Sequence, residues 1–150
     1  MGRYVLLLLA LCGSWACSRY VPVQSVGVVA EQKGTLTLRS TGYGDTRREA
    51  VDAAERHAVE QVLFRGLPGS QQTGPLVAID EDAARRNNSR YFETLLDQGR
   101  YRTFILSSVP VSDYGRAGRT QRNITMEVCI NLLALRSDLE AQGVIRKFGY

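Results

Sequence analysis

The sequence predicts an α+β domain in which helices pack on one face of a mostly antiparallel sheet. Three observations support this class: polar and apolar residues alternate over 35–40 and over 123–132, and a long amphipathic segment begins at Thr46. Alternation with period two is typical of strands with one buried face, whereas apolar residues at intervals of three and four indicate a helix. The expected order is strand, helix, helix, strand, strand, helix.

The size and composition of the chain fit one globular domain. It has 150 residues, of which 44% are hydrophobic and 23% charged. These values exclude a multidomain protein, a collagen-like fibre and a wholly disordered chain. A body of this size buries roughly two-thirds of its unfolded surface, so it needs neither a structural metal nor a disulfide framework to fold.

The first strand and first helix have clear local signals. Lys33-Gly34 is a turn signal, so a hairpin is expected between the segment 35–40 and the residues before it. Thr46 and Glu49 form a capping box, which predicts the start of the first helix, and Gly66 predicts its end. The apolar stripe of this helix is Ala50, Val51, Ala54, Ala58, Val59, Val62 and Leu63. Its alanines allow close packing against a sheet.

The second helix is expected after a loop over residues 66–78 that is rich in Gly, Pro, Ser and Gln. Three acids at 80–82 predict its start, because the helix dipole favours negative charge there, and Gly99 marks its end. The residues expected on its buried face are Tyr91, Phe92, Leu95 and Leu96.

The last third of the chain predicts an antiparallel hairpin followed by a short helix. Residues 101–109 are rich in aromatic and apolar side chains, and 111–118 is a turn punctuated by glycine. The second strand buries the alternating residues Ile124, Met126, Val128, Ile130 and Leu132. The final helix is expected to be capped by Ser137 and to stop at Gly143. The tail 144–150 docks either on its own domain, which we favour, or on a partner.

The first sixteen residues are predicted to be a secretory signal peptide. Arg3 precedes an apolar run of eight residues, Val5 to Cys12, which is shorter than the about 20 residues that span a bilayer. The stretch from Ser14 to Cys17 resembles a bacterial lipobox, in which a small residue precedes a cysteine that is acylated. Residues 17–27 are therefore interpreted as a lipidated N-terminus and tether, with Cys17 as the lipidation site, and 28–150 as the single domain.

Two alternatives to lipidation stay open at this stage. Ser14 stands where lipoboxes usually carry leucine, and Ser14-x-Ala16 also fits ordinary secretory cleavage at the same bond. An uncleaved anchor is the other alternative. If Cys12 leaves with the signal and Cys17 is acylated, Cys129 is the remaining cysteine and has no partner for a disulfide. Without the lipid, a Cys17–Cys129 bridge could form.

Signals for catalysis and metal binding are weak. His57 is the only histidine and is expected in mid-helix, packed or solvated rather than catalytic. One histidine and one free cysteine do not make a zinc site, and the acids at 80–82 lack the spacing of a calcium loop. Gly42-x-Gly44 lacks the other residues of phosphate-binding loops, which favours a structural turn. We expect no catalytic residue, metal or cofactor.

One basic cluster is a candidate ligand site. Arg116, Arg119 and Arg122 lie in or beside the expected hairpin turn, whereas Arg100 and Arg102 are expected at the opposite end of the hairpin. An anionic ligand such as lipid phosphate could bind at the turn; the alternative is a solvated tip. The formal net charge of +4 is too small to indicate a nucleic-acid partner, and none is expected.

The run from Ser40 to Ala50, continued by Ala54, Ala58 and Val59, resembles a group of small bacterial envelope domains. This group includes the N-terminal domain of the flagellar assembly protein T and outer-membrane lipoproteins similar to it. The resemblance covers about twenty residues and the order of elements. It implies a periplasm-facing, non-enzymatic domain associated with assembly.

The sequence therefore predicts an outer-membrane lipoprotein of the bacterial envelope that faces the periplasm. Its partners would be the membrane, through the N-terminal lipid, and envelope proteins, for which it would be a binding or assembly accessory. The first alternative is a domain that binds lipopolysaccharide or a cell-wall component through the basic hairpin tip. An envelope hydrolase is the weakest alternative.

Overall fold

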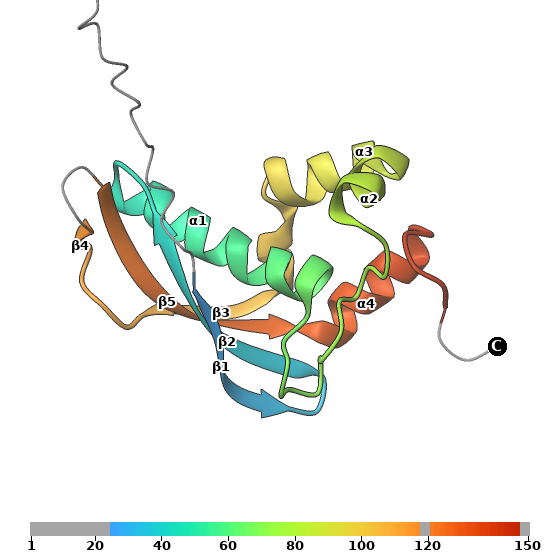
Figure 1. The fold of residues 1–150 in the computed structure, drawn as a ribbon, viewed down its shortest axis with the longest axis horizontal. Helices are drawn as coiled ribbons and strands as arrows, with labels where there is room; N and C mark the ends of the chain where they lie inside the picture. Colours follow the sequence, from blue (N-terminus) through green and yellow to red (C-terminus); the bar gives the residue numbers. More distant parts are fainter. Residues whose placement is uncertain (1–24, 118–120, 148–150) are drawn as a thin grey trace, which may run out of the picture.

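The computed structural model describes residues 25–117 and 121–147, and it shows the α+β class that the sequence predicts (Figure 1). Within these residues an open antiparallel sheet has the order β1-β2-β5-β3, and β4 also pairs with β5. The strands are β1 (Val26–Gln32), β2 (Thr35–Tyr43), β3 (Ile105–Pro110), β4 (Gly115–Ala117) and β5 (Gln121–Asn131).

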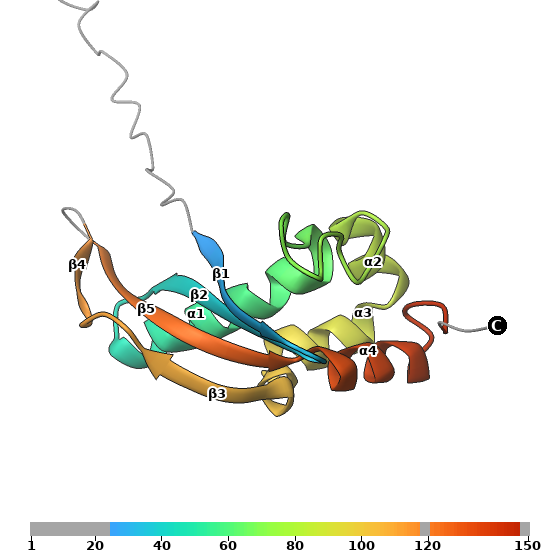
Figure 2. The same ribbon diagram turned by 90° about the horizontal axis from the view of Figure 1, so that it is seen from below.

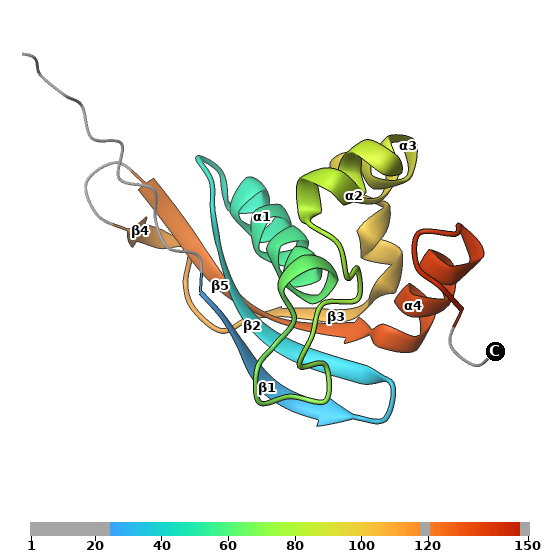
Figure 3. The same ribbon diagram turned by 45° about the vertical axis from the view of Figure 1, so that its right-hand side comes forward.

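The helical segments lie on one side of the sheet and at one of its ends. They are α1 (Arg47–Glu60) with the π-helical turn η1 (Gln61–Arg65), α2 (Glu81–Asn87), α3 (Ser89–Phe92) with the π-helical turn η2 (Glu93–Asp97), the 3₁₀ helix η3 (Arg100–Phe104) and α4 (Leu132–Ala141). Figure 3 shows α1 lying along the sheet with α2 and α3 beside it. Helix α4 continues directly from β5, at the opposite end of the molecule from β4 (Figure 2).

The local signals at the start of the domain are confirmed. The β1–β2 hairpin turns at Lys33-Gly34, and Gly34 has a φ of 84°. The capping box of α1 is present: the Glu49 amide donates to Thr46 Oγ1, and the Thr46 amide donates to Glu49 Oε2, each at 3.2 Å. The expected loop over 66–78 separates η1 from α2.

The core lies between α1 and the inner face of β2 and β5. The buried hydrophobic residues of these strands are Leu36, Leu38, Ile124, Met126, Val128 and Ile130. The alanines of α1 approach the sheet very closely, because a Cβ built at Gly42 would lie 2.0 Å from the carbonyl oxygen of Ala50. Small residues on both elements therefore bring the backbones of β2 and α1 into contact, as the alanine pattern predicts.

Three boundaries differ from those expected. The second helix is interrupted at Asn88, which has φ −131° and ψ 43° and separates α2 from α3. The strand expected from Tyr101 begins only at Ile105, because residues 100–104 form η3. The expected cap Ser137 lies inside α4, which begins after Asn131; the side chain of Asn131 accepts from the Ala134 amide at 3.0 Å.

Several predictions fall on residues that the structure does not describe. Residues 1–24 contain the expected signal peptide, Cys17 and most of the tether; 118–120 contain Arg119, and 148–150 end the tail. Among the described residues, no helix is long and apolar enough to cross a membrane.

Candidate functional site

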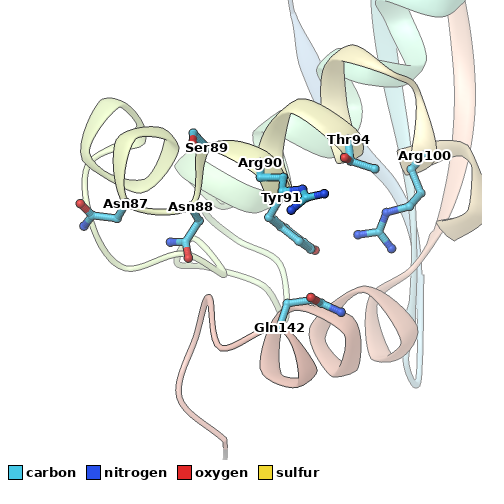
Figure 4. A pocket seen from close by; sticks show the side chains of 8 residues that line it. All are labelled: Asn87, Asn88, Ser89, Arg90, Tyr91, Thr94, Arg100 and Gln142. Carbon is cyan, nitrogen blue, oxygen red and sulfur yellow. The ribbon is translucent and has the colours of Figure 1, made fainter.

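A polar pocket lies between α3 with η2 on one side and α4 on the other (Figure 4). Its volume is about 560 Å³. We call it the α3–α4 pocket and define it by its lining residues, Asn87, Asn88, Ser89, Arg90, Tyr91, Thr94, Arg100 and Gln142. These side chains supply amide, hydroxyl and guanidinium groups together with one aromatic ring, which suits a polar ligand that carries hydrogen-bonding groups.

One wall of the pocket is fixed by Asp138 of α4. Arg100 donates two hydrogen bonds to this carboxylate, from Nη1 to Oδ1 at 3.0 Å and from Nη2 to Oδ2 at 2.9 Å. The hydroxyl of Tyr91 donates to Oδ2 at 2.7 Å. Burial acts to raise the pKa of Asp138, but the hydrogen bonds from Arg100 and Tyr91 outweigh it and hold the pKa below its ordinary value. The ionised carboxylate therefore joins α4 to α3 and η3.

The same contacts hold the aromatic surface of the pocket in place. The guanidinium of Arg100 lies 5.2 Å from the centre of the Tyr91 ring and 5.7 Å from that of Phe104. Burial, and then the hydrogen bond to Asp138, raise the pKa of Tyr91 above its ordinary value. The phenol thus stays protonated and acts as a donor to Asp138.

Arg90 gives the pocket a positive charge that no described acid balances. Its side chain is exposed and has no ion pair among residues 25–117 and 121–147. Figure 4 shows it beside Tyr91, on the same side of the pocket as Arg100. Because Arg100 is already paired with Asp138, Arg90 is the group that can bind a carboxylate or phosphate on a ligand.

The sequence analysis did not find this pocket, because it treated residues 80–99 as one continuous helix. The signal that could have indicated it is the run Asn87-Asn88-Ser89. These residue types compete with helical hydrogen bonds and favour caps and turns. Here they interrupt the helix and place three polar side chains at the pocket.

The second candidate site is the expected basic tip. Arg116 of β4 and Arg122 of β5 are directly opposite each other in the antiparallel pair. Both side chains are exposed. Arg119 lies within 118–120, outside the described residues. The structure therefore brings together two of the three predicted arginines.

The tip is attached to the start of α1. The hydroxyl of Tyr114 donates to the carbonyl oxygens of Gly44 and Asp45, at 3.1 and 2.7 Å. The guanidinium of Arg122 lies 5.5 Å from the centre of the Tyr114 ring. A smaller hollow of about 270 Å³ at this place is lined by the acidic residues Asp45 and Glu49 as well as by Arg122. Because the two acids disfavour an anion inside this hollow, an anion would bind the arginines at their exposed surface.

The other residues considered for chemistry have structural positions. His57 is packed, with 8% of its surface exposed, and burial lowers its pKa although Glu60 opposes the shift. Asp80 caps α2 by accepting from the amides of Asp82 and Ala83. Cys129 is a partly buried free thiol. Within the described ranges, no group of three His, Cys, Asp or Glu side chains is placed to hold a metal ion.

The fold and sites define the class of this protein as an α+β domain with an open antiparallel sheet, a polar pocket at one end and a basic tip at the other. Comparison with protein-family models, with curated proteins and with solved structures found no significant match. The arguments on function that follow therefore start from the residues of this chain.

Proposed function

We propose that this protein is a lipoprotein of the bacterial outer membrane whose domain faces the periplasm and acts as a non-enzymatic binding or assembly accessory. The signal-like residues 1–16 and the lipobox-like stretch that ends at Cys17 support the anchor. The resemblance of the run from Ser40 to Val59 to the envelope-domain group that includes the N-terminal domain of flagellar assembly protein T is the argument for an assembly role.

The observation that carries the binding role is the α3–α4 pocket. Its wall is held by three charge-assisted hydrogen bonds to Asp138, so little side-chain freedom remains to be lost when a partner binds. Arg90 has no ion pair among the described residues, so its guanidinium can pair with an anionic group on a partner. We infer a partner that presents a carboxylate or phosphate beside uncharged polar groups.

The anchor is tested by blocking lipoprotein processing with globomycin in cells that express the full chain. We expect the unprocessed precursor to accumulate, and labelled palmitate to be incorporated by the wild type but not by Cys17→Ala. Cys129→Ala is the matched control and should keep the label. If no precursor accumulates and palmitate is not incorporated, the anchor is wrong.

The pocket is tested by reversing the charge of Arg90. We expect Arg90→Glu to weaken recovery of the envelope partner from native membranes by roughly tenfold or more, since a hydrogen bond to a charged group contributes about 1.5–3 kcal/mol. Arg86→Glu is the matched control, because Arg86 is also exposed but does not line the pocket. Equal recovery with both variants would contradict a role for the pocket.

A second candidate function is binding of an anionic envelope ligand, lipopolysaccharide or a cell-wall component, at the basic tip. The observation that favours it is the pairing of Arg116 with Arg122. Like charges directly opposite each other destabilise an antiparallel pair. An anion bound between them would relieve this repulsion.

A further inference from the structure

We propose that the end of the domain with the basic tip lies against anionic lipid headgroups of the membrane in which Cys17 is anchored. This inference rests on the proposed function in one respect, the lipid on Cys17. It adds the surface that meets the membrane, the residues that bind it and the orientation of the domain.

The described chain begins at the same end of the sheet as the basic tip. The amide of Thr41 donates to the carbonyl oxygen of Ser25 at 3.4 Å, next to the β1–β2 pairing. Thr41 pairs with Thr125 of β5, and Asn123, two residues earlier on β5, pairs with Gly115 of β4. The order of the pairs therefore places Ser25 at the same end of the sheet as the β4–β5 pair, with β2 between β1 and β5, and α4 is at the other end (Figures 1 and 2).

The chain between Cys17 and the domain is short. Ser25 is eight residues after Cys17, and eight fully extended residues cover at most about 29 Å. An anchor at Cys17 therefore keeps this end of the sheet near the bilayer. A tether of this length allows this end of the sheet to contact the lipid headgroups. Whether it does so depends on the charged side chains at this end.

Two further arginines lie at this end, because α1 begins there. Gly44 donates its amide to the carbonyl oxygen of Arg122 at 3.2 Å, which places the start of α1 beside the tip. We define the basic end as the arginines Arg47, Arg48, Arg116 and Arg122. All four are exposed, and none has an ion pair among the described residues.

Three acids, Asp45, Glu49 and Asp113, lie near the four arginines, so the basic end keeps a net charge of +1. The Glu49 carboxylate accepts from the amides of Asp45 and Thr46 and faces the first turn of α1, whose dipole it balances. The guanidinium groups of the four arginines have no ion pair among the described residues, although that of Arg122 lies over the Tyr114 ring.

The positions of the four arginines are unfavourable for the isolated domain. Arg47 and Arg48 are in the first turn of α1, where the helix dipole disfavours positive charge. Arg116 and Arg122 repel each other across the β4–β5 pair. A layer of lipid phosphates would remove both costs, and each arginine near an anionic membrane would shift the ratio of docked to undocked domain by roughly fivefold.

This orientation also explains where a partner would bind. The α3–α4 pocket is formed beside α4, at the opposite end from β4 (Figure 2). With the basic end against the headgroups, the pocket points away from the membrane. A periplasmic partner could then reach Arg90.

The test uses the full lipidated chain reconstituted into phosphatidylcholine vesicles with or without phosphatidylglycerol. In a Cys129→Ser background, a fluorophore is attached at Ala117→Cys in β4 or at Ala141→Cys in α4, and quenching by nitroxide-labelled lipid is measured. We expect stronger quenching at 117 than at 141 in anionic vesicles. This difference in quenching between the two positions should diminish in neutral vesicles and at high salt, because both weaken the attraction between arginine and lipid phosphate.

Two sets of substitutions of arginine by glutamine give the matched comparison. The double variant Arg116→Gln with Arg122→Gln should abolish most of the difference in quenching between positions 117 and 141. Adding Arg47→Gln and Arg48→Gln should remove the rest of this difference without weakening the fold. Arg86→Gln with Arg146→Gln removes the same charge as the first double variant, but from exposed sites outside the basic end. It should therefore preserve the difference in quenching between positions 117 and 141. Equal quenching at 117 and 141 in lipidated, membrane-bound protein would overturn the inference alone. An intact mass without acyl chains on Cys17 would overturn the proposed anchor and the inference together.

Discussion

Gly42→Ala is expected to lower the free energy of unfolding by about 3 kcal/mol or more. The added Cβ would lie 2.0 Å from the carbonyl oxygen of Ala50 and 2.3 Å from the amide nitrogen of Ala54. Both atoms belong to the backbone of α1, so no side-chain rotation can relieve the clash. Helix α1 would have to move away from β2, which would open the centre of the core. Urea unfolding followed by circular dichroism measures the loss.

The control for this prediction is Gly27→Ala. Gly27 is in β1, and a Cβ at this position would meet no atom within 4 Å. We expect a change of less than about 0.5 kcal/mol, as for surface substitutions in general. If Gly42→Ala is as stable as Gly27→Ala, the close approach of α1 to β2 is incorrect.

Phe92→Ala is expected to cost about 3–5 kcal/mol, the range measured for removing a buried aromatic ring. Phe92 is 1% exposed and is among the largest fully buried side chains of the described residues. Its ring centre lies 5.4 Å from that of Phe64 and 5.2 Å from that of Tyr91. Truncation would leave a cavity between η1 and α3 and loosen the support of the α3–α4 pocket.

The measurement is again urea unfolding, with Leu133→Ala as the control. Leu133 is also a large apolar residue in a helix, but 62% of its surface is exposed, so its truncation should change stability little. Phe92→Leu keeps part of the buried volume, so its free energy of unfolding should lie between those of Phe92→Ala and Leu133→Ala. A Phe92→Ala variant as stable as Leu133→Ala would contradict the packing of α3 on η1.

The sequence predicted the elements whose ends depend on nearby residues. Thr46 and Glu49 define the start of α1 through hydrogen bonds within three residues. The alternation of β5 predicted its buried residues from Ile124 to Ile130, because the pleat points successive side chains to opposite sides whatever the neighbouring strand. Leu132, also expected on this face, instead begins α4 and is only partly buried. Gly143, with a φ of 70°, lies just beyond α4, as expected of a helix C-terminus.

The elements that the sequence predicted wrongly depend on distant contacts. Residues 101–104 have the composition of a strand, yet Tyr101 and Phe104 are buried from a 3₁₀ helix, and the Tyr101 hydroxyl donates to the carbonyl oxygen of Asp52 on α1 at 3.2 Å. Ser137 is a good capping residue, but β5 runs directly into α4, and Asn131 takes the capping position. Local propensity was overridden by packing in both places.

The sequence by itself determined the α+β class and most of the buried faces of α1 and β5, and it is the source of the roles proposed for Cys17 and the hairpin arginines. Only the tertiary structure decided which distant residues meet. Tyr91 and Arg100 reach Asp138 across 47 and 38 residues of chain, and Arg47 and Arg48 join Arg116 and Arg122 at one end of the sheet. The physical reason is that caps, turns and side-chain periodicity follow from backbone geometry over a few residues. Contacts between remote segments instead depend on how the whole core packs.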